Sequence, residues 1–173
     1  MKALRTTAIV LSGLALALSA GCGPSAGGDG PTPPRSDALA GVDPCSILTP
    51  QDLGTAGLRP NGSPQSDVAT EPGCYYSGRA MTVTTYKNVA ETVESSATKP
   101  DWAKFDRFDL NGRPAATSVS AGSTQAQICS TMFDSGKGMI RVSAHMKRAG
   151  NEDACQKSQE IAKQIEPRMP KKQ

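Results

Sequence analysis

The side chains that could act as nucleophile, base or metal ligand are few and scattered in this sequence. The chain has a single histidine, His145, and a catalytic triad needs such a base beside its nucleophile. His145 falls on the polar side of an alternating segment, beside Arg141 and Lys147, so we interpret it as a surface residue. One serine, Ser25, lies in a G-x-S-x-G pattern, but its surroundings are Gly- and Pro-rich and have neither the strand before it nor the helix after it that a nucleophile elbow needs. The residues therefore predict no catalytic site.

Two further patterns resemble ligand-binding loops but are better explained otherwise. Gly136-Lys137-Gly138 lacks the glycine spacing and the Ser or Thr of a phosphate-binding loop, so a hairpin turn explains it better. Asp101, Asp106 and Asp109 could bind a cation, but their spacing matches no known calcium loop. We interpret these acids as solvated charges and predict neither a metal site nor a cofactor.

The five cysteines divide into one beside an N-terminal signal and four further along the chain. Because an exported chain meets oxidising conditions, the even number formed by Cys45, Cys74, Cys129 and Cys155 predicts two disulfides. A zinc site is the alternative, but no two of these cysteines have C-x-x-C spacing. Paired thiols are unavailable as nucleophiles.

The N-terminus has the pattern of an export signal. Lys2 and Arg5 precede an uncharged run of 15 residues, 6–20, which is shorter than the roughly 20 residues that span a bilayer. The stretch Leu18-Ser19-Ala20-Gly21-Cys22 resembles a lipobox, in which the cysteine receives a diacylglyceryl group before cleavage. Lipoboxes usually have Leu where Ser19 stands. We predict lipidation of Cys22 and anchoring at the extracytoplasmic face of the cell membrane; a soluble secreted protein cut nearby is the alternative.

Composition divides the chain into four parts. Residues 1–21 form the signal peptide, and 22–42 form the lipidated cysteine with a Gly- and Pro-rich tether, which we expect to be disordered. Residues 43–167 have the size of one domain, and 168–173 form a basic tail. The domain has few aromatic residues and therefore a small hydrophobic core, so disulfides would help to stabilise it.

Charge argues against nucleic acid as a partner. Without Lys2 and Arg5 the 19 basic residues become 17 against 16 acidic ones, a net charge of +1, whereas nucleic-acid binders carry a basic stripe. The basic clusters are Lys147-Arg148 and the C-terminal tail. We interpret them as solvated surface, with weak contact to anionic lipid as the alternative.

Helix and strand patterns together indicate an α+β fold. Asp43-Pro44 and Thr49-Pro50 each place a capping side chain before a proline, which predicts a short helix, broken in two, over 44–56. A polar loop follows. Asn111-Gly112 suits a tight hairpin. We expect an antiparallel sheet of five to six strands, with the N- and C-terminal helices packed on one face. The strand patterns cover 74–77, 81–86, 105–110, 113–120, 125–133 and 139–147, and helical patterns cover 89–97 and 152–166.

A weak internal repeat of the strand and helix patterns bears on which cysteines pair. Cys74 opens a strand that is followed by a turn, an alternating strand and a helical pattern, and Cys129 opens the same series. Equivalent places in matching strands favour Cys74–Cys129, which leaves Cys45–Cys155 to join the first helix to the last. The spacing alone leaves all three pairings open.

Five short motifs follow one another along the mature domain. They are the opening Asp43-Pro44-Cys45-Ser46-Ile47-Leu48-Thr49, the Cys74-x-Tyr76 strand, the Asn111-Gly112-Arg113-Pro114-Ala115 turn, the Cys129 strand and Ala154-Cys155. In this order they resemble a large actinobacterial family of small lipoproteins with a domain of unknown function, although members often carry Trp where Tyr76 stands. The resemblance implies an envelope location, two disulfides and an α+β fold, and no established chemistry.

These observations favour a non-enzymatic binding or accessory module of the cell envelope. Its partners would be the membrane, through the lipid anchor, and an envelope protein or small ligand. The alternatives are a hydrolase acting on wall or lipid material and a regulatory partner of a membrane sensor. Trp102 could stack on a ligand, but a packing role is the favoured interpretation for a single tryptophan.

Overall fold

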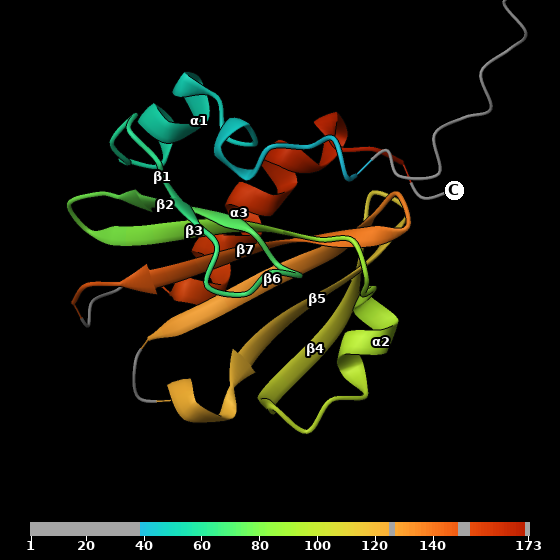
Figure 1. Cartoon of the computed structure of the whole chain (residues 1–173). Coiled ribbons are helices and arrows are strands. Elements are labelled where there is room, and N and C mark those ends of the chain that lie inside the picture. The colour runs from blue at the N-terminus through green and yellow to red at the C-terminus, as the bar shows by residue number, and fades with distance from the viewer. Residues whose placement is uncertain (1–38, 125–126, 149–152, 172–173) are drawn as a thin grey trace, which may run out of the picture. The chain divides into compact units, whose positions relative to one another are not determined.

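A computed structural model describes residues 39–124, 127–148 and 153–171, which form an α+β domain (Figure 1). Its seven strands make one antiparallel sheet in the order β1-β2-β3-β7-β6-β5-β4. The strands are β1 (Ser63–Gln65), β2 (Gly73–Ser77), β3 (Met81–Asn88), β4 (Trp102–Leu110), β5 (Arg113–Ser120), β6 (Ile128–Ser135) and β7 (Gly138–Met146). The α-helices are α1 (Pro50–Thr55), α2 (Val93–Ala97) and α3 (Ala154–Ile165). Three 3-10 turns are η1 (Pro44–Ser46), η2 (Ala121–Ser123) and η3 (Glu166–Arg168).

The predicted signal peptide, Cys22 and most of the predicted tether lie outside the described residues. Within the ranges given above, no helix is long and apolar enough to cross a membrane.

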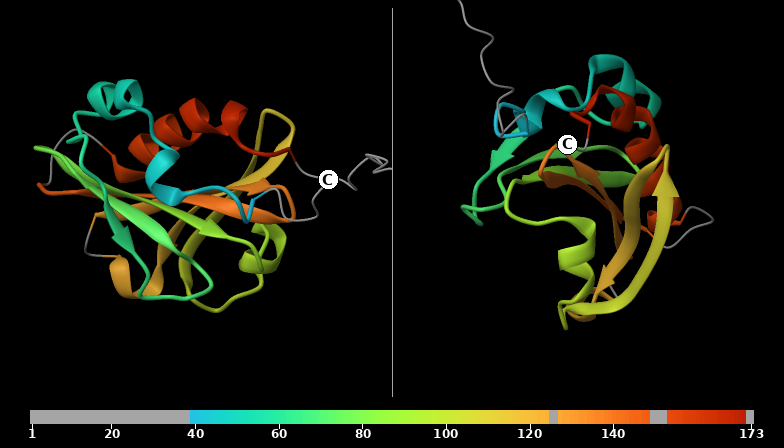
Figure 2. Two further views of the ribbon diagram at one scale, coloured as in Figure 1. Left: turned by 45° about the horizontal axis from the view of Figure 1, so that its top comes forward. Right: turned by 90° about the vertical axis from the view of Figure 1, so that its right-hand side faces the viewer.

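The two faces of the sheet carry different helices. Helices α1 and α3 lie on one face, as predicted, and α2 lies on the other (Figure 1). The sheet curves so that α2 lies within its concave side (Figure 2). The larger core, on the α3 face, is built around Phe133, Ile140, Val142 and Ile165. A small second core on the concave face contains Val93, Ala116, Met132 and Met139.

The N-terminal helix is broken in two, as the capping residues predict. The Asp43 carboxylate accepts a hydrogen bond from Cys45 N at 2.9 Å and begins η1. Thr49 and Asp52 form a reciprocal capping box that begins α1. Both segments are therefore set by local hydrogen bonds.

The predicted hairpins are present, and one strand is additional. Asn111 and Gly112 have φ of 53° and 84° between β4 and β5, which suits a tight turn with both central residues at positive φ. The sheet has seven strands because three residues of the predicted polar loop, Ser63–Gln65, pair with β2. This edge strand contains Pro64 and has no apolar alternation, so its pattern did not distinguish it from a loop.

The predicted disulfide pairing is wrong. The structure has Cys45–Cys74 and Cys129–Cys155. Cys74 and Cys129 lie in β2 and β6, and β3 and β7 separate these strands in the sheet. Three strand spacings amount to about 14 Å, whereas disulfide-bonded Cα atoms are at most about 7 Å apart. Each bridge instead joins a strand to the helical segment that packs directly on it.

Candidate functional site

The concave face holds a small pocket between α2, the segment that follows it and the sheet. Its volume is about 240 Å³. We call it the α2 pocket. Its lining combines apolar and charged side chains: Glu71, Glu91, Ser96, Lys99, Asp101, Trp102, Ser120, Met132, Met139 and Arg141. Seven of these ten residues are polar or charged, and Trp102, Met132 and Met139 are the apolar ones.

Helix α2 is fixed over the sheet by hydrogen bonds at both of its ends. Thr92 and Ser95 form a capping box at its start, and Val93 N donates to the Asp134 carboxylate at 2.8 Å. After the helix, Trp102 Nε1 donates to the Ser96 carbonyl oxygen at 2.8 Å. The position of one pocket wall therefore follows from these contacts.

Trp102 packs as predicted and also lines the pocket. Its ring lies 5.6 Å from that of Phe105, tilted by 45°, and both rings pack against the small core that contains Met132 and Met139. Trp102 can therefore both pack in the domain and stack on a ligand, because it packs against the small core and also lines the pocket.

Arg141, a residue of β7, lines the pocket. Its Nη2 donates to the Glu71 carboxylate at 2.6 Å, and its guanidinium carbon lies 4.3 Å from the centre of the Tyr86 ring. Its Nε–H is buried and has no hydrogen-bond partner among the described residues. A buried donor without a partner is costly, so this arginine has hydrogen-bonding capacity that the domain does not use.

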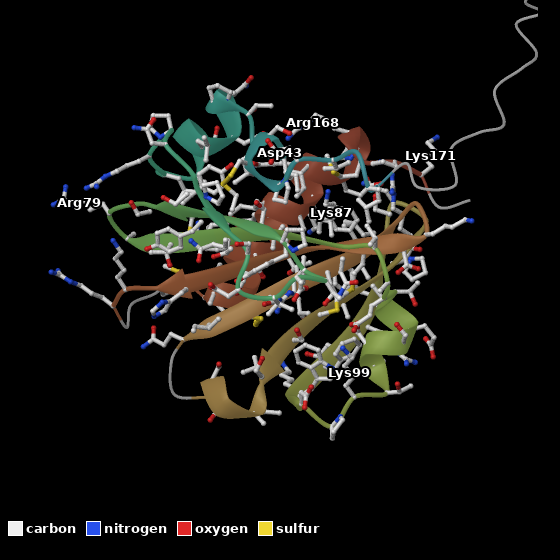
Figure 3. All side chains as sticks on the ribbon, in the orientation of Figure 1. Asp43, Arg79, Lys87, Lys99, Arg168 and Lys171 are labelled. Atoms are coloured by element: carbon white, nitrogen blue, oxygen red, sulfur yellow. A yellow bond between two sulfur atoms is a disulfide. The ribbon has the colours of Figure 1, made fainter. Side chains whose placement is uncertain are left out.

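The other charged residues that line the pocket include Glu91, Lys99 and Asp101. Lys99 Nζ and the Glu91 carboxylate form an ion pair at 2.6 Å, and Figure 3 shows Lys99 beside α2. Glu91 also accepts a hydrogen bond from Ser96 Oγ at 3.4 Å. Asp101 is exposed. The acids at Glu71 and Glu91 are therefore each paired with a basic side chain.

The residues that the sequence offered for catalysis, cation binding or stacking lie in different parts of the domain. His145 is exposed on the concave face, where it lies opposite Thr82 and Ile128 in the sheet register. Asp106 pairs with Lys104 at 2.9 Å. Asp109 accepts a hydrogen bond from Gly112 N at 2.8 Å, which supports the hairpin turn. Only Asp101 and Trp102 of the residues singled out for possible chemistry or stacking line the pocket.

Glu71 was not recognised in the sequence, and Arg141 was recognised only as a polar-face residue. They are 70 positions apart and meet because β3 lies between β2 and β7. The period-two pattern of β7 places Arg141 on the face opposite the main core. Glu71 lies in a loop and carries no pattern that points to Arg141.

Among the described residues, Asp52, Tyr76 and Lys104 have displaced pKa values, and all three lie outside the pocket. Burial raises the pKa of Asp52, but hydrogen bonds from Thr49 and Arg168 outweigh it, so the net shift is downward. Burial and the charge of Asp43 raise the pKa of Tyr76, whose hydroxyl donates to the Cys45 carbonyl. A hydrogen bond to Asp106 raises the pKa of the exposed Lys104. The Asp52 and Tyr76 contacts hold η1 and α1 in place.

A buried arginine holds the C-terminal segment. Arg113 is 6% exposed and forms an ion pair with Glu166, which is 4% exposed. Its Nη atoms also donate to the carbonyl oxygens of Met169 and Pro170. Arg168, assigned above to the basic tail, pairs with Asp52 at 2.6 Å. Residues 168–170 therefore pack against the domain.

A second pocket of about 250 Å³ lies on the α3 face. Residues of α1, α3 and the β2–β3 turn line it, among them Ala56, Met81 and Ile161. Within the described ranges, no group of three or more His, Cys, Asp or Glu residues could hold a metal ion.

The fold and the pocket define a disulfide-bonded α+β domain with a small, mostly polar pocket on its concave face. A family model described as a protein of unknown function, DUF3558, matches residues 17–168. The chain belongs to this family. Comparison with curated proteins found no match, and comparison with solved structures found none either.

Proposed function

We propose that this chain is a small actinobacterial envelope lipoprotein, held to the extracytoplasmic face of the cell membrane by a lipid on Cys22. Its domain is a non-enzymatic module that binds a small ligand in the α2 pocket. The export signal and the lipobox-like Ser19-Ala20-Gly21-Cys22 support the anchor. The pocket supports the binding role.

The observation that carries the binding role is that Arg141 and Trp102 line the same pocket. The positive charge of Arg141 favours a hydrogen-bond acceptor such as a carboxylate in the pocket. Trp102 favours an apolar body on the same molecule, whereas Met132 and Met139 are 0% and 3% exposed and offer little surface to it. A volume of about 240 Å³ limits that body to the size of one ring or a short chain.

Three related probes test this ligand class. All three contain a phenyl ring on a short chain. Phenylacetate carries only a carboxylate, phenethylamine carries only an ammonium group, and phenylalanine carries both. A ligand of about ten non-hydrogen atoms at about 0.3 kcal/mol each would bind with a Kd on the order of 10 mM. In calorimetric titrations we expect heat of binding from the two carboxylates and none from phenethylamine.

Two matched variants separate recognition from structural damage. Arg141→Gln and Glu71→Gln break the same ion pair, but only the first removes the charged donor. Loss of a charge-assisted hydrogen bond of about 1.5–3 kcal/mol predicts roughly 10- to 100-fold weaker carboxylate binding in Arg141→Gln. Glu71→Gln should retain binding. Equal losses in both variants, or no binding of either carboxylate to the native protein, would refute the proposal.

A further inference from the structure

One end of the domain concentrates unpaired positive charge. Arg59, Arg79, Lys147 and Arg148 are all exposed and come from three separate segments of the chain. We call this group the basic end. Figure 3 shows Arg79 at the opposite end of the domain from Lys171.

Backbone contacts gather these residues around the turn between β2 and β3. Arg59 N donates to the Ser77 carbonyl at 2.9 Å, and Lys147 N donates to the Ala80 carbonyl at 2.9 Å. Lys147 Nζ donates to the Gly78 carbonyl at 2.7 Å. These contacts place the backbone of Arg59 and Lys147 beside the turn that contains Arg79, and Arg148 directly follows Lys147 in the chain.

The charges of the basic end are not neutralised by the described acids. None of the four residues takes part in an ion pair there, whereas other basic side chains do: Lys99, Lys104, Arg107, Arg113, Arg141, Lys157 and Arg168. Glu160, which lines the pocket beside Ala80, is paired with Lys157 at 3.3 Å. The local field at this end is positive although the mature chain is nearly neutral.

We propose that the basic end docks on anionic phospholipid headgroups of the membrane that carries the chain. This inference rests on the lipid anchor proposed above, because the anchor keeps the domain near that surface. Each Lys or Arg close to an anionic bilayer strengthens partitioning by roughly fivefold. Unpaired charges make this contribution in full, since no acid has to be displaced.

The connection to the anchor is long enough for this contact. Leu39, the first described residue, packs near Gly136 in the β6–β7 turn. β3 extends from the basic end toward this turn over the eight residues Met81–Asn88, or about 25 Å. The segment from Cys22 to Leu39 can extend up to about 55 Å, so the basic end can reach the bilayer while Cys22 is inserted.

The test uses the chain from residue 22 onward with Cys22→Ser, so that no lipid contributes. Vesicles of phosphatidylcholine, with and without phosphatidylglycerol, are sedimented with the protein at low salt. The native surface should bind only the anionic vesicles and should be released by added salt. Because no lipid is attached, this result is independent of whether Cys22 is lipidated in cells.

Two triple variants with the same change in net charge locate the contact. Replacing Arg59, Arg79 and Arg148 by serine should weaken binding to anionic vesicles by about 100-fold. The matched control replaces the exposed Lys137, Lys163 and Lys171, and it should bind like the native surface. Equal loss in both triples, binding to neutral vesicles, or binding to soluble heparin but not to anionic vesicles would overturn the proposal.

Discussion

Replacement of Arg113 tests the most heavily bonded contact of the domain. In Arg113→Met the methionine fills much of the volume, but Glu166 loses its ion-pair partner. The carbonyl oxygens of Met169 and Pro170 lose their donor as well. Because Glu166 is only 4% exposed, water cannot fully replace the guanidinium.

The expected loss follows from this burial. Removal of one partner of a buried ion pair costs about 3–5 kcal/mol, which corresponds to a Tm roughly 10–20 °C lower for a domain of this size. Urea unfolding followed by circular dichroism measures the free energy of unfolding. Arg113→Met combined with Glu166→Leu should recover part of the loss, because no charge is then left buried. A loss below about 1 kcal/mol for Arg113→Met alone would refute the reasoning.

Three further predictions concern other contacts. Replacing Cys129 and Cys155 together by alanine opens a loop of 26 residues and should lower the free energy of unfolding by about 3.5 kcal/mol in chemical denaturation; an unchanged value would contradict the pairing. The lowered pKa of Asp52 contributes stability that is present above the ordinary aspartate pKa of about 3.9 and is lost as pH falls through the folded-state value. Acid unfolding of Asp52→Asn should therefore depend less on pH in that range, and an unchanged dependence would argue against the pair with Arg168. Cys22→Ala should abolish incorporation of a fatty-acid probe and release the chain from membranes washed at high salt, which removes contact through the basic end; retention after that wash would contradict the anchor.

Local elements of the fold were predictable because their signals lie within a few residues. Asp43 and Thr49 cap their own helical turns, and Asn111-Gly112 adopts the positive φ values that its hairpin requires. The alternation in β7 correctly separates the core face from the concave face. Each of these features depends on side chains acting on the adjacent backbone.

Features set by the order of the strands were not predictable from local patterns. The pairing of β3 with β7 determines that Cys74 and Cys129 are too far apart to bond. The same pairing brings Glu71 to Arg141. The apparent internal repeat favoured the wrong cysteine pairing. Helices α2 and α3 follow matching hairpins, but they pack on opposite faces of the sheet.

The most direct test of the binding role uses the fluorescence of Trp102, the single tryptophan of the chain. Because Trp102 lines the α2 pocket, a ligand there changes its surroundings, while a ligand in the second pocket does not contact it. Titration with phenylacetate should shift or quench the emission with saturation in the native protein and in Glu71→Gln, and much more weakly in Arg141→Gln. Emission that stays constant throughout the native titration, or that changes equally in Arg141→Gln, would contradict binding in this pocket.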